Sequence, residues 1–466
     1  MYCSSLEATS LAFLSCDPLT EAKVNDNLQR PRLLPSSPLA LNAALQGMSL
    51  LLQSPSVPTT LKQAQAHSES GAWKEACLRE LRAFRDHHTY DLVPLPEGQK
   101  PLGPRWVFTV KSPGLKKARL VAQGYTQQED IDHAETFAPV VRYDSVRVFL
   151  ALSACLRLLI HQMDVDTAFL NSKIDSEVYV RQPPGFVNTE HPDYVWKLNG
   201  GRHGLKQAPL LSNRHINRTQ QDAGFQRHDG DFGLYFKKTT EGLVLAALYV
   251  DDILLAAPSS CLLDKVKSLL TSTYSMKDLG VVNKFLGMNI HQGSKAITPS
   301  LEDYIISAAS STDIPIHRPV YTPLSSVDPL FNHKKSPLLT DVRPYQSIIG
   351  QLIFIANAGR PDVAYAVSIL SRFLKEPRQV HIHAANRVLQ YLYITRFRCL
   401  KYSYGTSVAV TIYSDAATCS RYDLPYSTGG YCTKPVEVNQ GSVFSDRRPI
   451  HPSKAKRDPS DSCSRC

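Results

Sequence analysis

The stretch that decides the fold reads Leu243-Val-Leu-Ala-Ala-Leu-Tyr-Val-Asp-Asp-Ile-Leu-Leu-Ala-Ala257, in which two apolar runs flank a pair of aspartates. Apolar runs of this length are typical of buried strands, and a short polar break between two of them is typical of a hairpin. The sequence therefore predicts a β-hairpin that carries Asp251 and Asp252 at its tip.

A third carboxylate follows another apolar run. Asp164 comes directly after Leu159-Ile-His-Gln-Met163, in a strand predicted over residues 162–169. Burying a carboxylate among aliphatic side chains costs free energy unless a cation or a hydrogen-bond donor compensates it. Two or three converging aspartates are the arrangement that Mg²⁺ prefers, and such ions promote in-line displacement at phosphorus. The alternative is that Asp251 and Asp252 are ordinary polar turn residues.

Periodicity predicts further elements around these carboxylates. Apolar residues from Trp73 to Phe84 recur every three or four positions, which indicates a helix with one buried face. The same reasoning predicts strands over 105–110, 118–122 and 284–290, and helices over 146–160 and 262–274.

The remainder of the chain shows weaker patterns. Residues 291–340 are rich in Pro, Ser and His and predict a linker or loosely packed connector. Helices are predicted over 345–373 and 380–393, and a strand over 408–413. Because strands and helices alternate irregularly and hairpins recur, the sequence predicts a mixed α+β fold.

The first 60 residues form a Ser/Pro-rich leader that we expect to be mostly disordered, apart from a short apolar helix over 39–52. The 466 residues carry a formal charge of +10, and no apolar run approaches the length of a membrane span. The ten cysteines follow no framework pattern, which favours free thiols in a reducing compartment. The charge admits nucleic acid as a partner but does not require it.

Seven motifs in a fixed order carry a resemblance to a known family. They resemble the reverse transcriptase of copia-type (Ty/copia) long-terminal-repeat retrotransposons. The motifs are Lys117-Ala-Arg-Leu-Val-Ala-Gln-Gly124, Glu135-Thr-Phe-Ala-Pro-Val140, Gln162-Met-Asp-Val-Asp-Thr-Ala-Phe-Leu-Asn171, Val178-Tyr-Val-Arg-Gln-Pro-Pro-Gly-Phe186, Gly204-Leu-Lys-Gln-Ala-Pro209, Tyr249-Val-Asp-Asp252 and Lys284-Phe-Leu-Gly287.

The resemblance implies an α+β right-hand polymerase with fingers, palm and thumb, followed by a connector and an incomplete ribonuclease H-like α/β domain. It implies fingers and palm over 61–290, thumb and connection over 291–400, a truncated ribonuclease H-like segment over 401–445 and an aberrant basic tail over 446–466. The implied activity is RNA-directed DNA polymerisation by two-metal nucleotidyl transfer to a primer 3′-hydroxyl. The implied cofactor is a pair of Mg²⁺ ions, for which Mn²⁺ can substitute.

By similarity, Asp164, Asp251 and Asp252 are the catalytic metal ligands, whereas Asp166 falls at a variable position and is structural or solvent-facing. Phe169 matches the bulky residue that excludes a ribonucleotide 2′-hydroxyl; the alternative is a core aromatic. The other implied contacts are Lys117, Arg119 and Gln207 to the nucleotide, and Lys206, Tyr249, Val250, Phe285 and Gly287 to primer or template. For Lys117 and Arg119 the alternative is a solvated basic loop.

Departures from the family pattern indicate loss of function. Arg202-His203 stands where the family has Leu-Tyr or Met-Tyr, and Ser212 where it has Trp. Asp415 alone represents the ribonuclease H carboxylates, so nuclease activity is expected to be absent, and the tail indicates a frameshift or early stop. Cys463 and Cys466 have the spacing of half a zinc site without a second pair. For His381 and His383 we expect structural roles.

The resemblance also implies binding partners and a cellular location. The partners are an RNA or DNA template with its primer, deoxynucleoside triphosphates and other retrotransposon products, and no membrane. The expected location is a cytoplasmic virus-like particle or the nucleus, without secretion, and the chain is expected to be a polyprotein fragment. The second hypothesis is a catalytically dead relic that at most binds nucleic acid.

Overall fold

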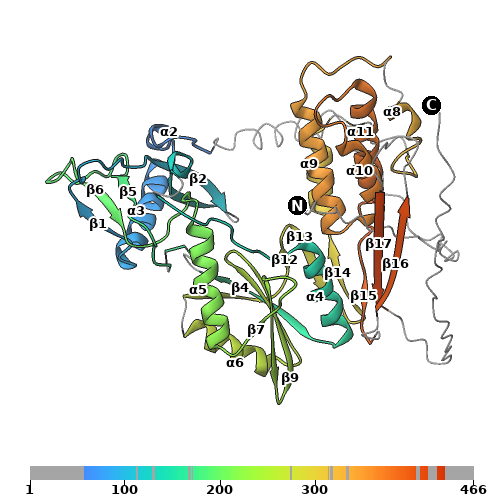
Figure 1. Ribbon diagram of the computed structural model, residues 1–466, viewed down its shortest axis with the longest axis horizontal. Coiled ribbons are helices and arrows are strands. Elements are labelled where there is room, and N and C mark those ends of the chain that lie inside the picture. Colours follow the sequence, from blue (N-terminus) through green and yellow to red (C-terminus); the bar gives the residue numbers. More distant parts are fainter. Residues whose placement is uncertain are drawn as a thin grey trace, which may run out of the picture.

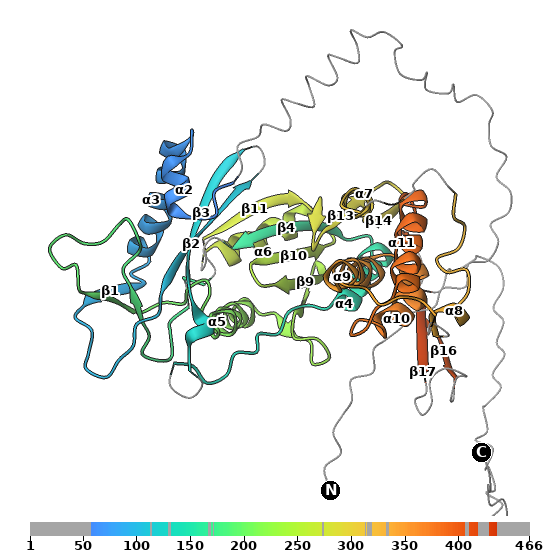
Figure 2. The same ribbon diagram turned by 90° about the horizontal axis from the view of Figure 1, so that it is seen from above.

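The computed structural model describes residues 57–111, 114–128, 132–165, 169–170, 172–272, 275–312, 314, 319–331, 335–405, 410–417 and 428–435. These residues form an N-terminal lobe, a central sheet with its helices, and a C-terminal lobe dominated by helices (Figures 1 and 2). The predicted helix over 39–52 and the tail over 446–466 lie outside the described residues.

The N-terminal lobe packs two helices against two small sheets. Trp73 and Phe84 of its long helix are buried against Trp106, Leu120 and Trp196 of the strands, which is the apolar face that the periodicity predicts. One sheet is the β2–β3 hairpin, and the other has the order β1-β6-β5. The elements are α2 (Leu61–Ala66), α3 (Ser70–Asp86), β1 (Tyr90–Val93), β2 (Pro104–Lys111), β3 (Leu115–Ala122), η1 (Gly124–Thr126), β5 (Tyr179–Arg181) and β6 (Val195–Leu198).

The central sheet contains the predicted hairpin, which is confirmed. Six strands are paired among the described residues, all antiparallel, in the order β11-β4-β10-β9-β8-β7. The strands are β4 (Leu159–Val165), β7 (Gln226–Arg227), β8 (Leu234–Thr239), β9 (Gly242–Tyr249), β10 (Asp252–Ala257) and β11 (Met276–Val281), and the helices around them are α4 (Tyr143–Cys155), α5 (Ala208–Asp222) and α6 (Ser260–Thr271).

The inner strands β4, β9 and β10 of the central sheet are buried on both faces. Met163 and Ile253 belong to the core that includes residues of α5 and α6, whereas Ile160 and Leu254 belong to the core shared with α4 and the C-terminal lobe. Successive side chains of a strand point to opposite faces, so a strand buried on both faces reads as a continuous apolar run. This explains the unbroken runs on either side of Asp251 and Asp252.

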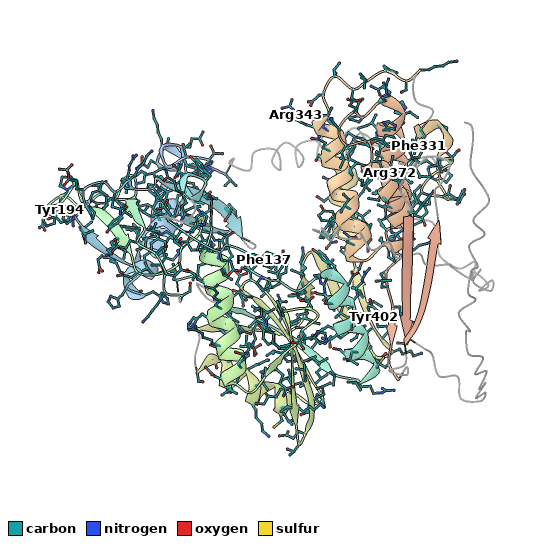
Figure 3. All side chains as sticks on the ribbon, in the orientation of Figure 1. Phe137, Tyr194, Phe331, Arg343, Arg372 and Tyr402 are labelled. Atoms are coloured by element: carbon teal, nitrogen blue, oxygen red, sulfur yellow. The ribbon has the colours of Figure 1, made fainter. Side chains whose placement is uncertain are left out.

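The C-terminal lobe is continuous with one face of the central sheet through a shared core. Figure 3 marks its two ends, with Arg343 far from the sheet and Tyr402 close to α4. Its elements are β12 (Lys284–Phe285), β13 (Met288–Gln292), β14 (Ala296–Ser300), α7 (Glu302–Ser310), α8 (Asp328–Phe331), α9 (Arg343–Ala358), η2 (Pro361–Val363), α10 (Ala364–Ser371), α11 (Gln379–Ile394), β15 (Tyr402–Ser403), β16 (Val410–Ala417) and β17 (Thr428–Pro435).

Four predicted boundaries are wrong. The helix predicted over 146–160 ends at Cys155, because the backbone reverses at Arg157 (φ 53°) and the next residues enter β4. The strand predicted over 162–169 ends at Val165, and Phe169 lies in a turn. The strand predicted over 284–290 is the β12–β13 hairpin. The helix predicted over 345–373 is two helices, α9 and α10, interrupted where proline removes a helix donor at Pro361.

The connector predicted over 291–340 is also wrong in part, because β14, α7 and α8 lie within it and contribute core residues such as Ile297 and Ile305. Short elements bounded by prolines and serines leave little periodicity for sequence reading to detect. No helix among the described residues has the length and apolar character needed to span a membrane.

Candidate active site

A row of polar side chains crosses the central sheet where β4, β9, β10 and β11 come together. Asp252 lies directly opposite Asp164 on β4 and opposite Tyr249 on β9, and Lys277 on β11 lies opposite Asp164. Residues directly opposite in antiparallel strands share one face. The row therefore runs Lys277, Asp164, Asp252, Tyr249 along one face. Asp252 is the first residue of β10 rather than part of the tip.

The hairpin tip consists of Val250 and Asp251. Val250 has φ 59°, which is strained for a β-branched residue and is found where surrounding contacts enforce it. One such contact is the amide of Val165, which donates a hydrogen bond of 2.8 Å to the backbone oxygen of Asp251. The turn thus holds Asp251 next to the end of the strand that carries Asp164.

Sequence reasoning missed two neighbours of the carboxylates. The buried Gln162 donates from Nε2 to Oδ1 of Asp252 at 3.0 Å, which orients that carboxylate. Lys277 supplies a cation beside Asp164 through strand register alone. Gln162 stands in one of the quoted motifs, but no local sequence signal indicates its contact with Asp252 or the position of Lys277, because both form only across the sheet.

The donor set fits a hard divalent cation. In the described part of the chain, no three or more His, Cys, Asp or Glu side chains form a group arranged to hold a metal. Asp164 and Asp252 nevertheless share one face as adjacent carboxylates, with Asp251 in the adjoining turn. Mg²⁺ is commonly bound by one or two carboxylates and completed by substrate phosphates and water. These residues therefore fit Mg²⁺ that is bound together with a phosphate ligand.

The β2–β3 hairpin separates its basic residues by face. Ala118 and Leu120 are buried against α3, so Lys117 and Arg119 point to the opposite face. Lys116, on the α3 side, forms a 2.8 Å ion pair with Glu69. The register places the two predicted nucleotide ligands together on the face away from α3.

Gln207 and Lys206 differ in their surroundings. Gln207 is fully buried; its Nε2 donates to the Asp132 oxygen at 2.9 Å and to Ser176 Oγ at 3.2 Å, and its Oε1 accepts from Gln127 at 3.0 Å. Both donors of the Gln207 amide are therefore used inside the protein. Lys206 is exposed, with Nζ 3.1 Å from the backbone oxygen of Gln127.

The predicted primer-contact residues lie in the β12–β13 hairpin. Phe285 is buried in the core shared with the central sheet. The turn uses two positive φ values, 47° at Leu286 and 79° at Gly287. A Cβ on Gly287 would lie 2.9 Å from the Phe354 ring, so glycine meets both the conformational and the spatial requirement.

Arg202 and Ser212, two departures from the family pattern, are packed inside the molecule, and so is His381, for which a structural role is expected. Arg202 is buried with its guanidinium 4.0 Å from the Phe84 ring centroid and 4.7 Å from that of Trp196, and burial lowers its pKa to about 9. Neither of its two terminal nitrogens has a hydrogen-bond partner among the described residues. Ser212 is buried in α5. The buried His381 contacts the Leu330 oxygen at 3.0 Å and stacks on Phe373.

Other predicted positions lie in β16 or outside the described residues. Asp415 lies in β16, where its backbone pairs with Gly430 of β17. Asp166, Cys463 and Cys466 lie outside the described residues.

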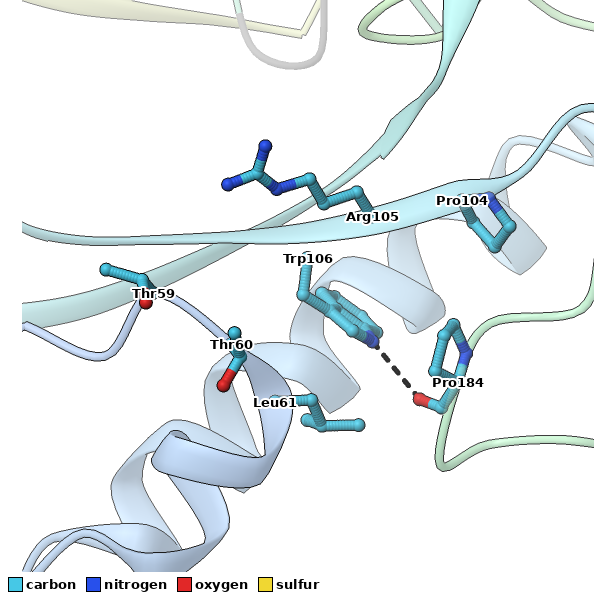
Figure 4. Close-up of a pocket in the computed structure, with 7 residues that line it drawn as sticks. All are labelled: Thr59, Thr60, Leu61, Pro104, Arg105, Trp106 and Pro184. Atoms are coloured by element: carbon cyan, nitrogen blue, oxygen red, sulfur yellow. Dashed lines mark hydrogen bonds between the residues drawn. The ribbon is translucent and has the colours of Figure 1, made fainter.

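A cavity of about 340 Å³ in the N-terminal lobe contains none of the predicted site residues. Figure 4 shows Trp106 donating to the Pro184 oxygen (3.2 Å), while Arg105 projects from the other side of β2. The lining residues are Thr59, Thr60, Leu61, Pro104, Arg105, Trp106 and Pro184.

Comparison with known proteins identifies the class. Residues 87–326, more than half of the chain, match the family model described as reverse transcriptase (RNA-dependent DNA polymerase). The chain is 59% identical over 272 residues to a transposon Ty5-1 protein of Saccharomyces cerevisiae, covering 58% of this chain and 88% of the relative. The chain therefore belongs to the copia-type reverse transcriptase family.

Longer relatives are matched over part of their length. The chain is 34% identical to the Pol polyprotein from transposon TNT 1-94 of Nicotiana tabacum and to that from transposon RE1 of Arabidopsis thaliana. The matches cover 80% and 82% of this chain but only 29% and 26% of those polyproteins. A foamy viral protease-reverse transcriptase in complex with double-stranded DNA aligns over 69% of this chain and 48% of its own, at 13% identity and a TM-score of 0.37. That likeness bears on neither site nor mechanism.

Proposed function

We propose that the protein is an RNA-directed DNA polymerase that adds deoxynucleotides to the 3′-hydroxyl of a primer annealed to an RNA or DNA template. The observation that carries the proposal is the alignment of Asp164 with Asp252 across β4 and β10, next to the strained turn that holds Asp251. Membership in the reverse transcriptase family supports the same reaction.

Asp164, Asp251 and Asp252 are the residues that would hold two Mg²⁺ ions, or Mn²⁺ in their place. When bound, the ions supply activation of the primer hydroxyl and neutralisation of charge on the leaving pyrophosphate. Gln162 keeps the Asp252 carboxylate in one orientation through its 3.0 Å hydrogen bond. A fixed carboxylate loses little conformational entropy on binding, which favours a pre-organised site.

Lys117 and Arg119 bind the triphosphate, because cationic donors form short, strong hydrogen bonds to phosphate oxygens. Their common position on the face away from α3 supports this role. Phe169 excludes the 2′-hydroxyl of a ribonucleotide. Gln207 acts from inside the protein by holding the segments that contain Asp132 and Ser176.

Primer and template contact the neighbouring hairpins. Lys206 contacts a phosphate of the nucleic acid. Tyr249 and Val250 support the duplex next to the carboxylates. Phe285 and Gly287 support the 3′ end of the primer. The exposed side chain of Lys206 and the shaped β12–β13 turn support these assignments.

The division into fingers and palm (61–290), thumb and connection (291–400) and a ribonuclease H-like segment (401–445) belongs to the proposal. Asp415 is the one residue of this segment that matches a ribonuclease H carboxylate of the family, so nuclease activity is not part of the proposal. The protein acts in cytoplasmic virus-like particles or in the nucleus, together with other retrotransposon products.

A catalytically dead relic that binds nucleic acid is the second candidate. The observation that favours it is Arg202, a buried cation whose terminal nitrogens lack hydrogen-bond partners within the described ranges. Such a group destabilises the lobe that carries Lys117 and Arg119.

Primer extension on poly(rA)–oligo(dT) with Mg²⁺ separates the two candidates. We expect extension by the wild-type protein, a loss of at least about a thousandfold in the Asp251→Ala/Asp252→Ala variant, and wild-type rates in Asp229→Asn, which changes an exposed aspartate of the β7–β8 turn. Wild-type extension no faster than the double variant contradicts the polymerase proposal. Retained duplex binding with a salt-dependent affinity then favours the relic.

A further inference from the structure

The ring of Phe169 rests against the ring of His203. Their centroids are 4.8 Å apart at an interplanar angle of 79°, an edge-to-face arrangement. Both side chains are partly buried. Aromatic pairs of this geometry are attractive beyond the area they bury, so each ring restricts the rotation of the other.

The backbone of Phe169 is held by the same part of the chain. Its carbonyl oxygen accepts hydrogen bonds from the amide (3.3 Å) and the hydroxyl (2.8 Å) of Ser172, and the Gly201 amide donates to the Ser172 oxygen at 2.8 Å. A Cβ on Gly201 would lie 2.6 Å from the Phe169 oxygen. The close approach therefore requires glycine at this position and brings His203 within reach of Phe169.

The segment 200–204 is anchored on its other side to the basic hairpin. The Ala122 amide of β3 donates to the His203 oxygen at 2.9 Å, and a Cβ on Gly204 would lie 2.1 Å from the Ala122 oxygen. Arg202, between two aromatic rings, fixes the segment in the N-terminal core. His203 thus connects the strand that carries Lys117 and Arg119 with the ring of Phe169.

The His203 ring is uncharged at neutral pH. Burial, together with the nearby charges of Arg119, Lys117 and Arg202, lowers its pKa to about 4. A neutral imidazole packs against an aromatic edge without the desolvation cost of a cation.

We propose that His203 is a positioning residue for nucleotide selection, which holds the Phe169 ring in the orientation that rejects a ribose 2′-hydroxyl. The inference rests on the proposed function and on the role proposed there for Phe169. An unbraced ring rotates away from the sugar and admits the extra oxygen, whereas a braced ring cannot. His203 itself need not touch the nucleotide.

The test is the ratio of kcat/KM for dTTP to that for UTP, measured on poly(rA)–oligo(dT) with the full chain. The variants are His203→Ala and His203→Leu, which remove the ring, His203→Phe, which keeps it, and Phe169→Ala. We expect a roughly three- to tenfold lower ratio in the two ringless variants, a nearly wild-type ratio in His203→Phe, and a larger loss in Phe169→Ala.

A merely structural role for His203 lowers both rates together and leaves their ratio unchanged. The ratio of dTTP to UTP affinities in a complex stalled on a dideoxy-terminated primer gives the same information without turnover, should a variant extend slowly. A wild-type ratio in both ringless variants, with a lowered ratio in Phe169→Ala, overturns the role of His203 alone. An unchanged ratio in Phe169→Ala overturns the role of Phe169 and the inference with it, and an inactive wild-type protein overturns the proposed function.

Discussion

Two buried cations of this protein, Lys267 and Arg202, are compensated in different ways. In the Lys267 cluster, Lys267 of α6 contacts His161 Nδ1 at 2.6 Å and forms a 2.8 Å ion pair with Asp278. In the Arg202 cluster, the guanidinium lies among aromatic rings, and its terminal nitrogens have no acceptor in the part of the chain that the structure describes. The first cation is ion-paired, whereas the second is compensated by ring faces and by the charge of Glu80, with which it forms no ion pair among the described residues.

The different surroundings of Lys267 and Arg202 have different consequences for stability. Lys267 joins α6 to β4 and β11, the two strands whose register brings Lys277 opposite Asp164. Removing one partner from a buried pair leaves an uncompensated charge, whereas replacing an unpaired buried charge with an apolar group relieves one. The two clusters therefore predict effects of opposite sign on stability.

The largest expected effect is on the Lys267 cluster. Lys267→Met should lower the free energy of unfolding by about 2 kcal/mol, because His161 and Asp278, whose side chain is 47% exposed, lose their shared charged partner. Primer extension should fall as well, since the β11–β4 register loosens. Urea unfolding of this variant beside Lys265→Met, which removes only an exposed ion pair to Glu241, provides the measurement and its control. Equal stability of the two variants would contradict the prediction.

The effect of intermediate size is the pH dependence of stability that comes from His203, the residue after Arg202. The pKa of His203 lies near 4, below its usual value, so the unfolded chain binds more protons between about pH 6.5 and pH 4. The stability that this shift contributes is present above pH 6.5 and is lost as the pH falls toward 4. The groups that face His203 are Arg119, Lys117, Arg202 and the ring of Phe169.

His161 also has a lowered pKa, caused by burial and then by Lys267, and contributes with the same sign. The prediction is therefore a difference: thermal unfolding of His203→Phe should show a shallower loss of stability toward acid pH than the wild type. Parallel curves for the two proteins would mean that His203 does not titrate in this range.

The smallest expected effect is a gain in stability when Arg202 is replaced. Arg202→Met should raise the free energy of unfolding by about 1 to 2 kcal/mol, because a buried, unpaired guanidinium is replaced by an apolar side chain of similar length. The loss of its contacts with Phe84 and Trp196 and of its attraction for Glu80 offsets part of the gain. A variant less stable than the wild type by chemical denaturation would show that the ring contacts outweigh the desolvation cost.

Sequence reading succeeded where the signal is local. The hairpin around Asp251 and Asp252, the α3 helix and the β2–β3 pair follow from periodicity over a few residues, and all three are present. It failed where the backbone reverses inside an apolar run. Residues 146–160 are mostly apolar, yet the chain changes from helix to strand around Arg157, and apolar content alone cannot distinguish the two states.

In the candidate site, too, the sequence predicted the residues that stand out locally and not the contacts between distant segments. Asp164, Asp251 and Asp252 were predictable because aspartates that interrupt apolar strands are conspicuous and stand in ordered motifs. The inward use of Gln207 was not predictable, because its partners Gln127, Asp132 and Ser176 are separated from it by 31 to 80 positions.

By itself, the sequence determined the mixed α+β class, the carboxylate-bearing hairpin and membership in the reverse transcriptase family, since each depends on residue types in a fixed local order. Only the tertiary structure decided that Lys277 lies opposite Asp164 and that His203 supports Phe169. Such neighbours are set by strand register and by the packing of distant segments. Those are properties of the folded chain that no short stretch of sequence contains.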